Sequence, residues 1–255
     1  FLKKISSISK NMHALGMGGI NEPLPKILNK LGFDLRPVHF LFTPLKISSL
    51  FKIFLQNRNL NFFKFLSLLF KPMDLMILFF YKMKFFKSEK ITIKKFDKFD
   101  HQDNAIWEKI KNNFYLIAEK KAENLNIIYH SERFNLTKLR LYDGEEYLGW
   151  IVLKITSHDG DKYFGHETTC TIVDLCSKPC NYNVIINIIK KTAIENNAGV
   201  ILMNSLNKTF NYHLKKNFFI KSNSNFAFAS KLEDSSVNYD ESWITRGDGD
   251  GPINL

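Results

Sequence analysis

Two stretches of the chain, 186 residues apart, share one pattern of apolar residues. Residues 13–42 read HALGMGGINEPLPKILNKLGFDLRPVHFLF, and residues 199–228 read GVILMNSLNKTFNYHLKKNFFIKSNSNFAF. A repeat of this kind predicts two copies of one structural unit, each passing from strand to helix to strand. The gapless offset (219 − 33 = 186) superimposes Leu15 on Ile201, Met17 on Met203, Ile20 on Leu206, Asn21 on Asn207, Leu28 on Leu214, Lys30 on Lys216, Phe33 on Phe219, Phe40 on Phe226 and Phe42 on Phe228.

The repeat divides the chain into parts. Residues 1–45 correspond to the closing third of a first domain, and residues 88–230 to a complete second domain. The sequence opens on Phe1-Leu2-Lys3-Lys4-Ile5, which has the pattern of a helix interior and no initiator Met. We therefore expect a chain that is truncated at its N-terminus, from which a targeting segment could be missing.

Residues 46–87 form a basic, Phe-rich linker between the two copies. Lys71, Pro72 and Asp74 interrupt its apolar runs, so no stretch reaches the roughly 20 apolar residues of a membrane-spanning helix. The pattern predicts two helices separated at Pro72. Either these helices bury their phenylalanines against the domains, which we favour because the apolar residues surround the helix, or they lie on an anionic membrane surface.

Within residues 88–230, the periodicity predicts an α+β (α/β) domain with a mixed, mostly antiparallel sheet flanked by helices. The expected order is strand, helix, three antiparallel strands, helix, strand, helix and two strands. The predicted elements are strands 90–96, 137–142, 147–155, 168–175, 200–203, 218–221 and 226–229, and helices 103–114, 181–196 and 208–216.

Composition narrows the class of protein. The net charge is +11, but Lys, Asn, Ile and Phe are abundant together, as in a chain with a biased composition, and no nucleic-acid-binding module is recognisable, so we expect no nucleic-acid partner. The three cysteines are odd in number and indicate a reducing, cytoplasmic setting, peripheral to the inner face of the membrane if the linker binds lipid. Cys176 and Cys180 have no second ligand pair at zinc-site spacing, so we expect no metal. Residues 231–255 form an acidic Gly/Asp-rich tail, for which a mobile extension is expected.

The element order resembles the GNAT superfamily of acyl-CoA-dependent acyltransferases. Gly149-Trp150-Ile151-Val152 on the third strand and Asn217-Phe218-Phe219 after the last helix carry this resemblance. The chain also resembles the tandem GNAT-like proteins of bacterial surface-polysaccharide clusters. That further resemblance rests on Gly16-Met17-Gly18-Gly19 with Pro23-Leu24-Pro25, Ala122-Glu123-Asn124-Leu125-Asn126, Ile172-Val173-Asp174-Leu175 and Trp243-Ile244-Thr245-Arg246-Gly247-Asp248.

The resemblance implies a cofactor site. Acetyl-CoA or another acyl-CoA would enter between the strands at 168–175 and 200–203, with its pyrophosphate on unpaired amides at the following helix start. The expected cofactor-binding residues are Leu175, Cys176, Lys178, Asn181, Tyr182 and Asn183. The glycines of the family's pyrophosphate signature are absent from this segment.

The resemblance also implies catalytic groups. A carboxylate base is expected on the fourth strand, where Asp174 and Glu167 are the candidates, and burial would raise the pKa of Asp174. On a regular strand two residues seven apart face opposite sides, so one of them at most serves a given pocket. As an alternative, Asp174 caps loop amides. The family's proton-donating Tyr is replaced by Leu214, and Tyr212 and His213 point elsewhere around the helix.

These features imply an acyltransferase that moves an acyl group from acyl-CoA to an amine or hydroxyl of a small-molecule or sugar-precursor acceptor. A backbone N–H of a bulge in the fourth strand, near Leu175, would stabilise the oxyanion. The alternative is a catalytically degenerate GNAT-like domain that acts as a binding or scaffold partner in polysaccharide assembly.

Overall fold

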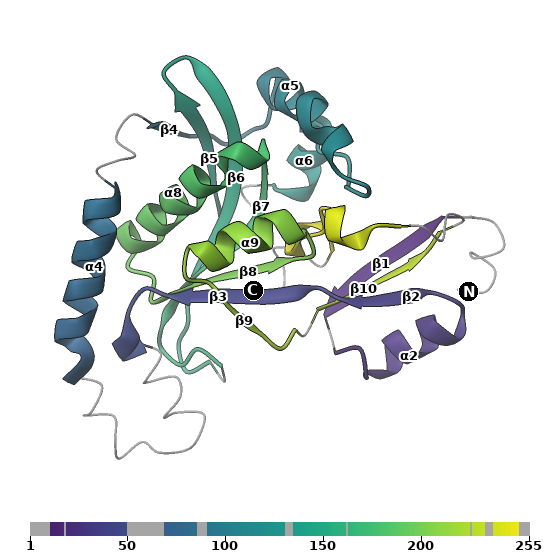
Figure 1. Ribbon diagram of the computed structural model, residues 1–255, viewed down its shortest axis with the longest axis horizontal. Helices are drawn as coiled ribbons and strands as arrows, with labels where there is room; N and C mark the ends of the chain where they lie inside the picture. The colour runs from purple at the N-terminus through teal and green to yellow at the C-terminus, as the bar shows by residue number, and fades with distance from the viewer. Residues whose placement is uncertain are drawn as a thin grey trace.

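The computed structural model describes residues 11–17, 19–49, 69–85, 91–130, 135–161, 163–224, 226–232 and 237–249 (Figure 1). The predicted helical start of the chain and most of the Phe-rich first half of the linker lie outside these ranges. The strands are β1 (Met12–Met17), β2 (Asp34–Pro37), β3 (His39–Pro44), β4 (Ile91–Lys95), β5 (Leu136–Asp143), β6 (Glu146–Ser157), β7 (Thr168–Ser177), β8 (Val200–Ser205), β9 (Ile220–Ser222) and β10 (Phe226–Lys231). The α-helices are α2 (Pro23–Lys30), α4 (Lys71–Phe85), α5 (His101–Ile110), α6 (Ala122–Ile128), α8 (Tyr182–Glu195) and α9 (Lys208–Lys216).

The strands form two sheets. The large sheet has the order β4-β5-β6-β7-β8-β3-β9, and the small sheet has the order β1-β10-β2. Every pair of neighbouring strands is antiparallel except β7 and β8, which are parallel. The predicted α+β class, with a mostly antiparallel sheet flanked by helices, is confirmed.

The two repeated segments exchange their closing strands. In the large sheet, β3 from the first segment lies between β8 and β9 of the second, and in the small sheet β10 lies between β1 and β2. The offset of 186 residues places α2 on α9, β2 on β9 and β3 on β10 to within about one residue. The boundaries at residues 45 and 88 therefore divide the chain but not the sheets, because the sheet of the second domain contains a strand of the first (Figure 1).

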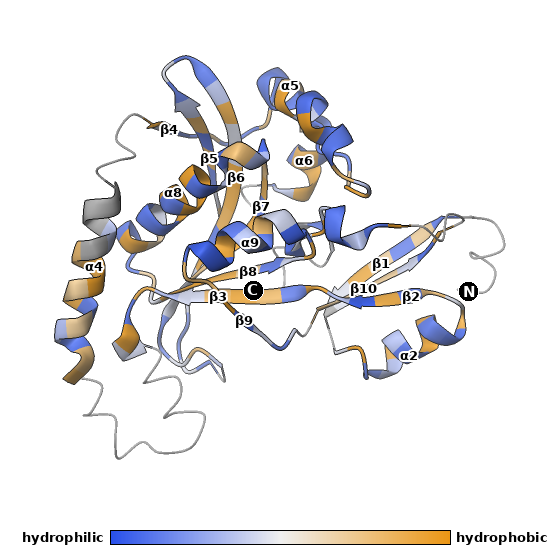
Figure 2. Ribbon diagram, in the orientation of Figure 1, coloured by the Kyte–Doolittle hydropathy of each residue, from blue (hydrophilic) through white to orange (hydrophobic). Residues whose placement is uncertain are grey.

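Each face of the large sheet carries its own core. The core on the side of α8 and α9 includes Ile151, Leu175 and Met203, whereas the core beneath α5 and α6 includes Trp150 and Val173. The buried strands are rich in Ile, Leu and Val because both of their faces are covered. Figure 2 shows the hydrophobic residues concentrated in these central strands.

In its described part, the linker contains the second of the two predicted helices, and most of the first lies outside the described residues. Residues 71–85 form one helix, α4, which begins at Lys71 with Pro72 in its first turn, where a missing N–H costs nothing. The Asp74 carboxylate anchors α4 by accepting hydrogen bonds from the backbone N–H groups of Ile47 and Ser48 at 2.5 and 3.1 Å. Phe79 remains 61% exposed, so the expected burial of the linker phenylalanines is wrong at this position. No helix within the described ranges is long and apolar enough to cross a membrane.

The tail also differs from its prediction. Residues 237–249 pack against the large sheet instead of forming a mobile extension, and Trp243 and Thr245 are fully or almost fully buried. Two short 3₁₀ helices, η5 (Tyr239–Glu241) and η6 (Arg246–Asp248), flank the buried stretch. The mobility expected from the acidic composition is therefore wrong for residues 237–249. Trp243 and Ile244 supply enough apolar surface to hold this part of the tail in place.

Candidate functional site

Asp174 is the centre of a buried polar network. Its Oδ2 atom accepts from the Lys120 ammonium at 2.5 Å and from the Tyr129 hydroxyl at 3.0 Å. Its Oδ1 atom accepts from the Leu175 N–H at 2.8 Å and from the Trp243 indole N–H at 3.2 Å. The Asp174 side chain is completely buried, and these four donors, with a longer contact of 3.4 Å from the Thr245 hydroxyl to Oδ1, fill the roughly four acceptor positions of a carboxylate.

A β-bulge directs Asp174 into this network. The pairing of β6 with β7 passes from Val152–Asp174 to Leu153–Ile172, which leaves Val173 as the extra residue. A bulge shifts the alternation of side chains by one position, so Asp174 stays on the face of Val152 and Val173, toward α6. Strict alternation would have placed it beside Ile172 on the opposite face.

Lys120 joins three parts of the chain. Its ammonium also bonds Asp248 of η6 at 3.2 Å, so a loop before α6, a central strand and the tail meet at one cation. Burial alone would lower the pKa of Lys120, but Asp174 and Asp248 reverse this effect and hold the pKa above its usual range. Burial, together with the neighbouring Asp248, raises the pKa of Asp174. At neutral pH the lysine is charged and serves to neutralise buried carboxylates.

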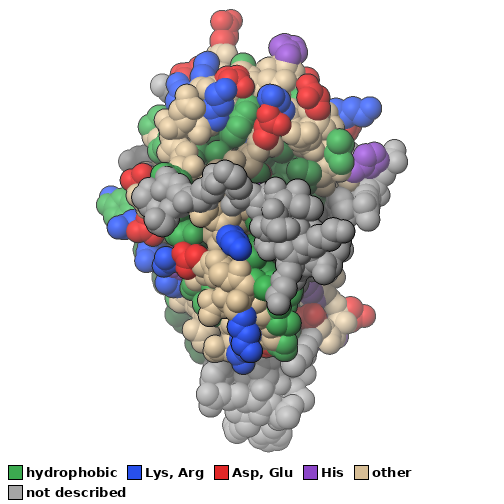
Figure 3. All heavy atoms as spheres, turned by 90° about the vertical axis from the view of Figure 1, so that its right-hand side faces the viewer, with side chains coloured by type: hydrophobic (Ala, Val, Ile, Leu, Met, Phe, Trp, Pro, Cys, Tyr) green, Lys and Arg blue, Asp and Glu red, His purple; other side chains and the backbone are tan. Residues whose placement is uncertain are grey.

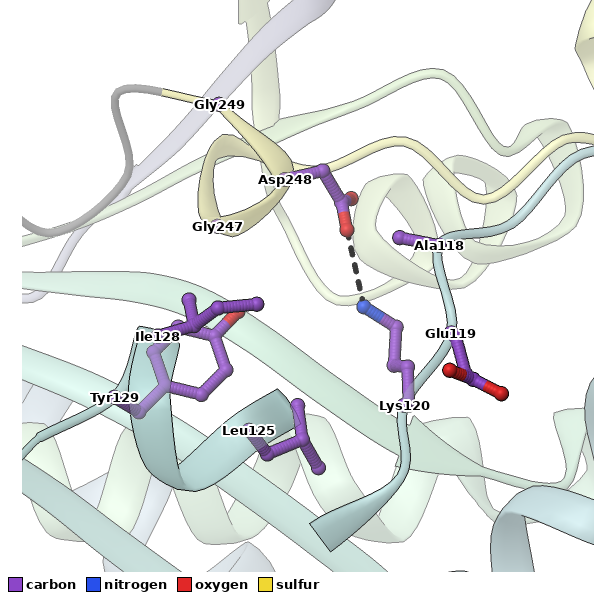
Figure 4. Close-up of a pocket in the computed structure, with 9 residues that line it drawn as sticks. All are labelled: Ala118, Glu119, Lys120, Leu125, Ile128, Tyr129, Gly247, Asp248 and Gly249. Atoms are coloured by element: carbon purple, nitrogen blue, oxygen red, sulfur yellow. Dashed lines mark hydrogen bonds and ion pairs between the residues drawn. The ribbon is translucent and has the colours of Figure 1, made fainter. Parts of the chain in front are cut away.

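A cavity of about 220 Å³ borders this network (Figure 4). Its lining includes Lys120, Tyr129 and Asp248, together with Glu119 and Leu125. Gly247 also borders the cavity, and a Cβ atom there would lie 2.2 Å from the Tyr129 hydroxyl. Only glycine lets the tail approach the network this closely.

The tail occupies the space between β7 and β8 in which acyl-CoA was predicted. The two strands pair only from Thr169–Val200 to Ile172–Met203 and then separate. Beyond that point Ser205 bridges to Thr245, and the Leu206 N–H donates to the Ile244 carbonyl at 3.1 Å. Trp243 fills the remaining space, with its ring centroid 5.3 Å from that of Phe210 and 5.9 Å from that of Tyr182.

The predicted cofactor residues do not form an open cradle. The Leu175 N–H is used by Asp174, Cys176 and Tyr182 are buried in the two cores, and Lys178 lies 3.9 Å from Glu146. The Asn181 side chain caps no backbone N–H of α8. Asn183 accepts from His213 at 3.0 Å and from Asn217 at 3.1 Å. These six positions therefore serve packing and local hydrogen bonding in the closed structure.

Glu167 and Asp174 do not share a pocket. Glu167 precedes the opposite end of β7, where it accepts from the Ser49 hydroxyl at 2.8 Å. Leu214, at the position of the family's Tyr, is completely buried, while Tyr212 is 53% exposed. No group of three or more His, Cys, Asp or Glu side chains that could hold a metal occurs within the described ranges.

Sequence reasoning identified Asp174 but missed its partners. Lys120, Tyr129 and Asp248 stand 54, 45 and 74 residues away, and no local pattern connects them. One available signal was Trp243-Ile244 in the otherwise polar tail, since an apolar pair of this size is rarely left in solvent.

Comparisons with known proteins leave the family open. No family model and no curated protein matches the chain. A solved structure, of a functionally unknown conserved protein from Staphylococcus epidermidis ATCC 12228, is similar with a TM-score of 0.44 and 10% sequence identity, covering 90% of this chain and 75% of that one.

Proposed function

We propose that this chain is a GNAT-like domain without acyl-CoA turnover that acts as a binding or scaffold partner, as its resemblance to proteins of surface-polysaccharide assembly implies. The observation that carries the proposal is the placement of residues 243–248 between the separated ends of β7 and β8. An acyl-CoA at this place would have to displace Trp243, which is only 2% exposed.

The state of the catalytic candidates supports the same proposal. A general base needs a free lone pair within hydrogen-bond reach of the acceptor, and both oxygens of Asp174 already accept from Lys120, Tyr129, Leu175 and Trp243. The Leu175 N–H, the expected oxyanion donor, points to that carboxylate instead. Leu214 supplies no proton to a departing thiolate.

Calorimetric titration with CoA, acetyl-CoA and a longer acyl-CoA tests the proposal, together with a thiol assay for released CoA. We expect no saturable heat at millimolar ligand and no thiol release with amine or sugar acceptors. A known acyl-CoA-dependent acetyltransferase under the same conditions is the positive control. Saturable binding accompanied by turnover in the unaltered protein would refute the proposal.

An acyltransferase is the second candidate, and the separation of β7 from β8 after a bulge favours it. In this alternative the tail must leave before acyl-CoA enters. The Trp243→Ala variant lacks the side chain that fills the gap, so acyl-CoA binding by this variant distinguishes the two candidate functions. Acyl-CoA binding that appears only in this variant would favour a tail-gated enzyme, whereas its absence in both proteins agrees with a binding role. Circular dichroism verifies that the variant is folded.

The surface adds one observation on partners. The face that is turned toward the viewer in Figure 3 carries Lys and Arg side chains intermixed with Asp and Glu over its upper part. Sequence-independent nucleic-acid binding relies on a field of one sign, so this face gives no support to a nucleic-acid partner. A sugar-precursor ligand and contact of residues 46–87 with an anionic membrane remain proposals.

A further inference from the structure

Within the part of the chain that the structure describes, Arg246 is a buried cation without an anionic partner. Its side chain belongs to η6, and the residue is only 7% exposed. Its Nε atom has no hydrogen-bond partner, and burial, with no carboxylate to oppose it, lowers the pKa of Arg246 to about 10. The guanidinium carbon lies 5.1 Å from the ring centroid of Phe226, a cation–π contact that is weaker than an ion pair.

The nearest acidic residue along the chain does not neutralise Arg246. Asp248, two positions later, binds Lys120 at 3.2 Å and accepts from the Thr245 hydroxyl at 3.1 Å and the Thr245 N–H at 2.7 Å. A buried charge without a partner strongly destabilises a fold. The position of Arg246 therefore calls for an anion from outside the described residues.

Other polar groups without partners lie on the neighbouring strands. Asn204 and Arg246 are the residues next to the antiparallel bridge between Ser205 and Thr245. Asn204 is 1% exposed, yet neither its amide oxygen nor its amide nitrogen has a partner. Thr171, on the neighbouring strand β7, is equally buried, and its hydroxyl also has no partner.

Lys154 adds positive charge. It pairs with Thr171 across β6 and β7, so the two side chains share a face of the sheet. Burial lowers the pKa of Lys154, and the charge of Arg246 lowers it further, which shows that the two cations influence each other. Two cations, an amide and a hydroxyl thus come from β6, β7, β8 and η6.

We propose that Arg246, Asn204 and Thr171, with Lys154 at their border, bind the oxyanion of a small ligand, a carboxylate or a phosphate. The guanidinium presents paired N–H donors that match two oxygens of such a group. The Asn204 amide and the Thr171 hydroxyl would bond the rest of the anion or a neighbouring hydroxyl. All three residues are at least nine-tenths buried, which excludes a polymer surface as the ligand. The site lies on the tail segment that fills the gap between β7 and β8, but it requires no acyl-CoA and does not depend on the proposed function.

The site is tested by thermal unfolding and calorimetry with two anions, inorganic phosphate and glucuronate, at an ionic strength matched by NaCl. The comparison shows whether the site binds a phosphate or a carboxylate. We expect one of them to bind saturably and to raise the Tm by about 3–5 °C at ten times its Kd. Arg246→Met should weaken that binding at least tenfold while leaving the unliganded protein as stable or more stable, because it removes a buried unpaired charge. Asn204→Leu should also weaken binding.

The exposed Arg36, which pairs with Asp34 at 3.0 Å, supplies the matched control, and Arg36→Met should leave binding unchanged. If Arg246→Met does not fold, Arg246→Lys takes its place, because it keeps the charge but loses the paired donors and should still weaken binding. Two results would overturn the proposal. One is that neither anion stabilises the protein beyond the NaCl control, which is the result expected if only ordered water binds at the site. The other is that the Arg246 variants bind the anion as well as the unaltered protein.

Discussion

At the scale of single residues, the Lys120–Asp174 pair tests whether the buried network is structural. Lys120→Met leaves Asp174 and Asp248 buried without their common cation, so we expect a loss of about 3–5 kcal/mol in the free energy of unfolding. Asp174→Asn should cost less, because Lys120 keeps Asp248, the Trp243 indole N–H can still donate to the amide oxygen, and the Tyr129 hydroxyl can accept from the amide nitrogen. Urea unfolding measures both.

The adjacent lysine provides the control for this prediction. Lys121 lies in solvent and pairs with Glu119 at 2.7 Å, so Lys121→Met should change stability little. Equal effects of the two lysine substitutions would show that the Lys120 pair contributes no more than a surface contact.

The same residues show where sequence reasoning stops. The prediction placed Asp174 at the end of a strand among apolar neighbours and anticipated a raised pKa, and the structure agrees on both. The resemblance implied a bulge in this strand near Leu175, but the spacing does not show that Val173 is the extra residue, because one extra residue leaves no mark on an apolar run. The donors Lys120, Tyr129 and Trp243 stand 45 to 69 residues from Asp174, and local spacing does not reveal such contacts.

At the scale of elements, the repeat predicts more of the fold than composition does. Helix α9 begins and ends where the periodicity placed it, and Asn207 caps it by accepting from the Phe210 N–H at 2.8 Å. The helix α6 was not predicted, because its seven residues are too short to show a clear period. The exchange of β3 and β10 was not predicted either. The two strands share one apolar pattern, so each fits the position of the other equally well.

Equivalent positions in α2 and α9 should respond differently to the same substitution. Leu24 corresponds to Phe210 by the offset, yet Leu24 is 57% exposed and Phe210 is completely buried, with its ring 4.9 Å from that of Tyr182. Phe210→Ala should cost about 3–5 kcal/mol. Leu24→Ala should stay within about 0.5 kcal/mol, because it removes little buried surface. Thermal or urea unfolding of both variants makes the comparison, and a large loss for Leu24→Ala would show that α2 is covered in solution.

At the scale of the whole molecule, strand exchange makes the two sheets depend on each other. Each sheet receives its middle or near-edge strand from the other repeated segment, so neither segment can leave without opening both sheets. The tail strengthens this connection, because Ile244 packs with Phe226 and Phe228 of β10 while Trp243 belongs to the core of the large sheet. We therefore expect one cooperative unfolding transition.

Leu41→Ala in β3 tests this dependence. Leu41 is completely buried in the large sheet, where it pairs with Met203, so its truncation should cost about 2–5 kcal/mol. If the sheets unfold together, hydrogen exchange should show the same loss of protection in β8 and, within the small sheet, in β1 and β10. Ile220→Ala in β9, where the side chain is 53% exposed, is the control and should change neither sheet. Protection that falls in β8 but stays unchanged in β1 and β10 would mean that the two sheets open independently despite their exchanged strands.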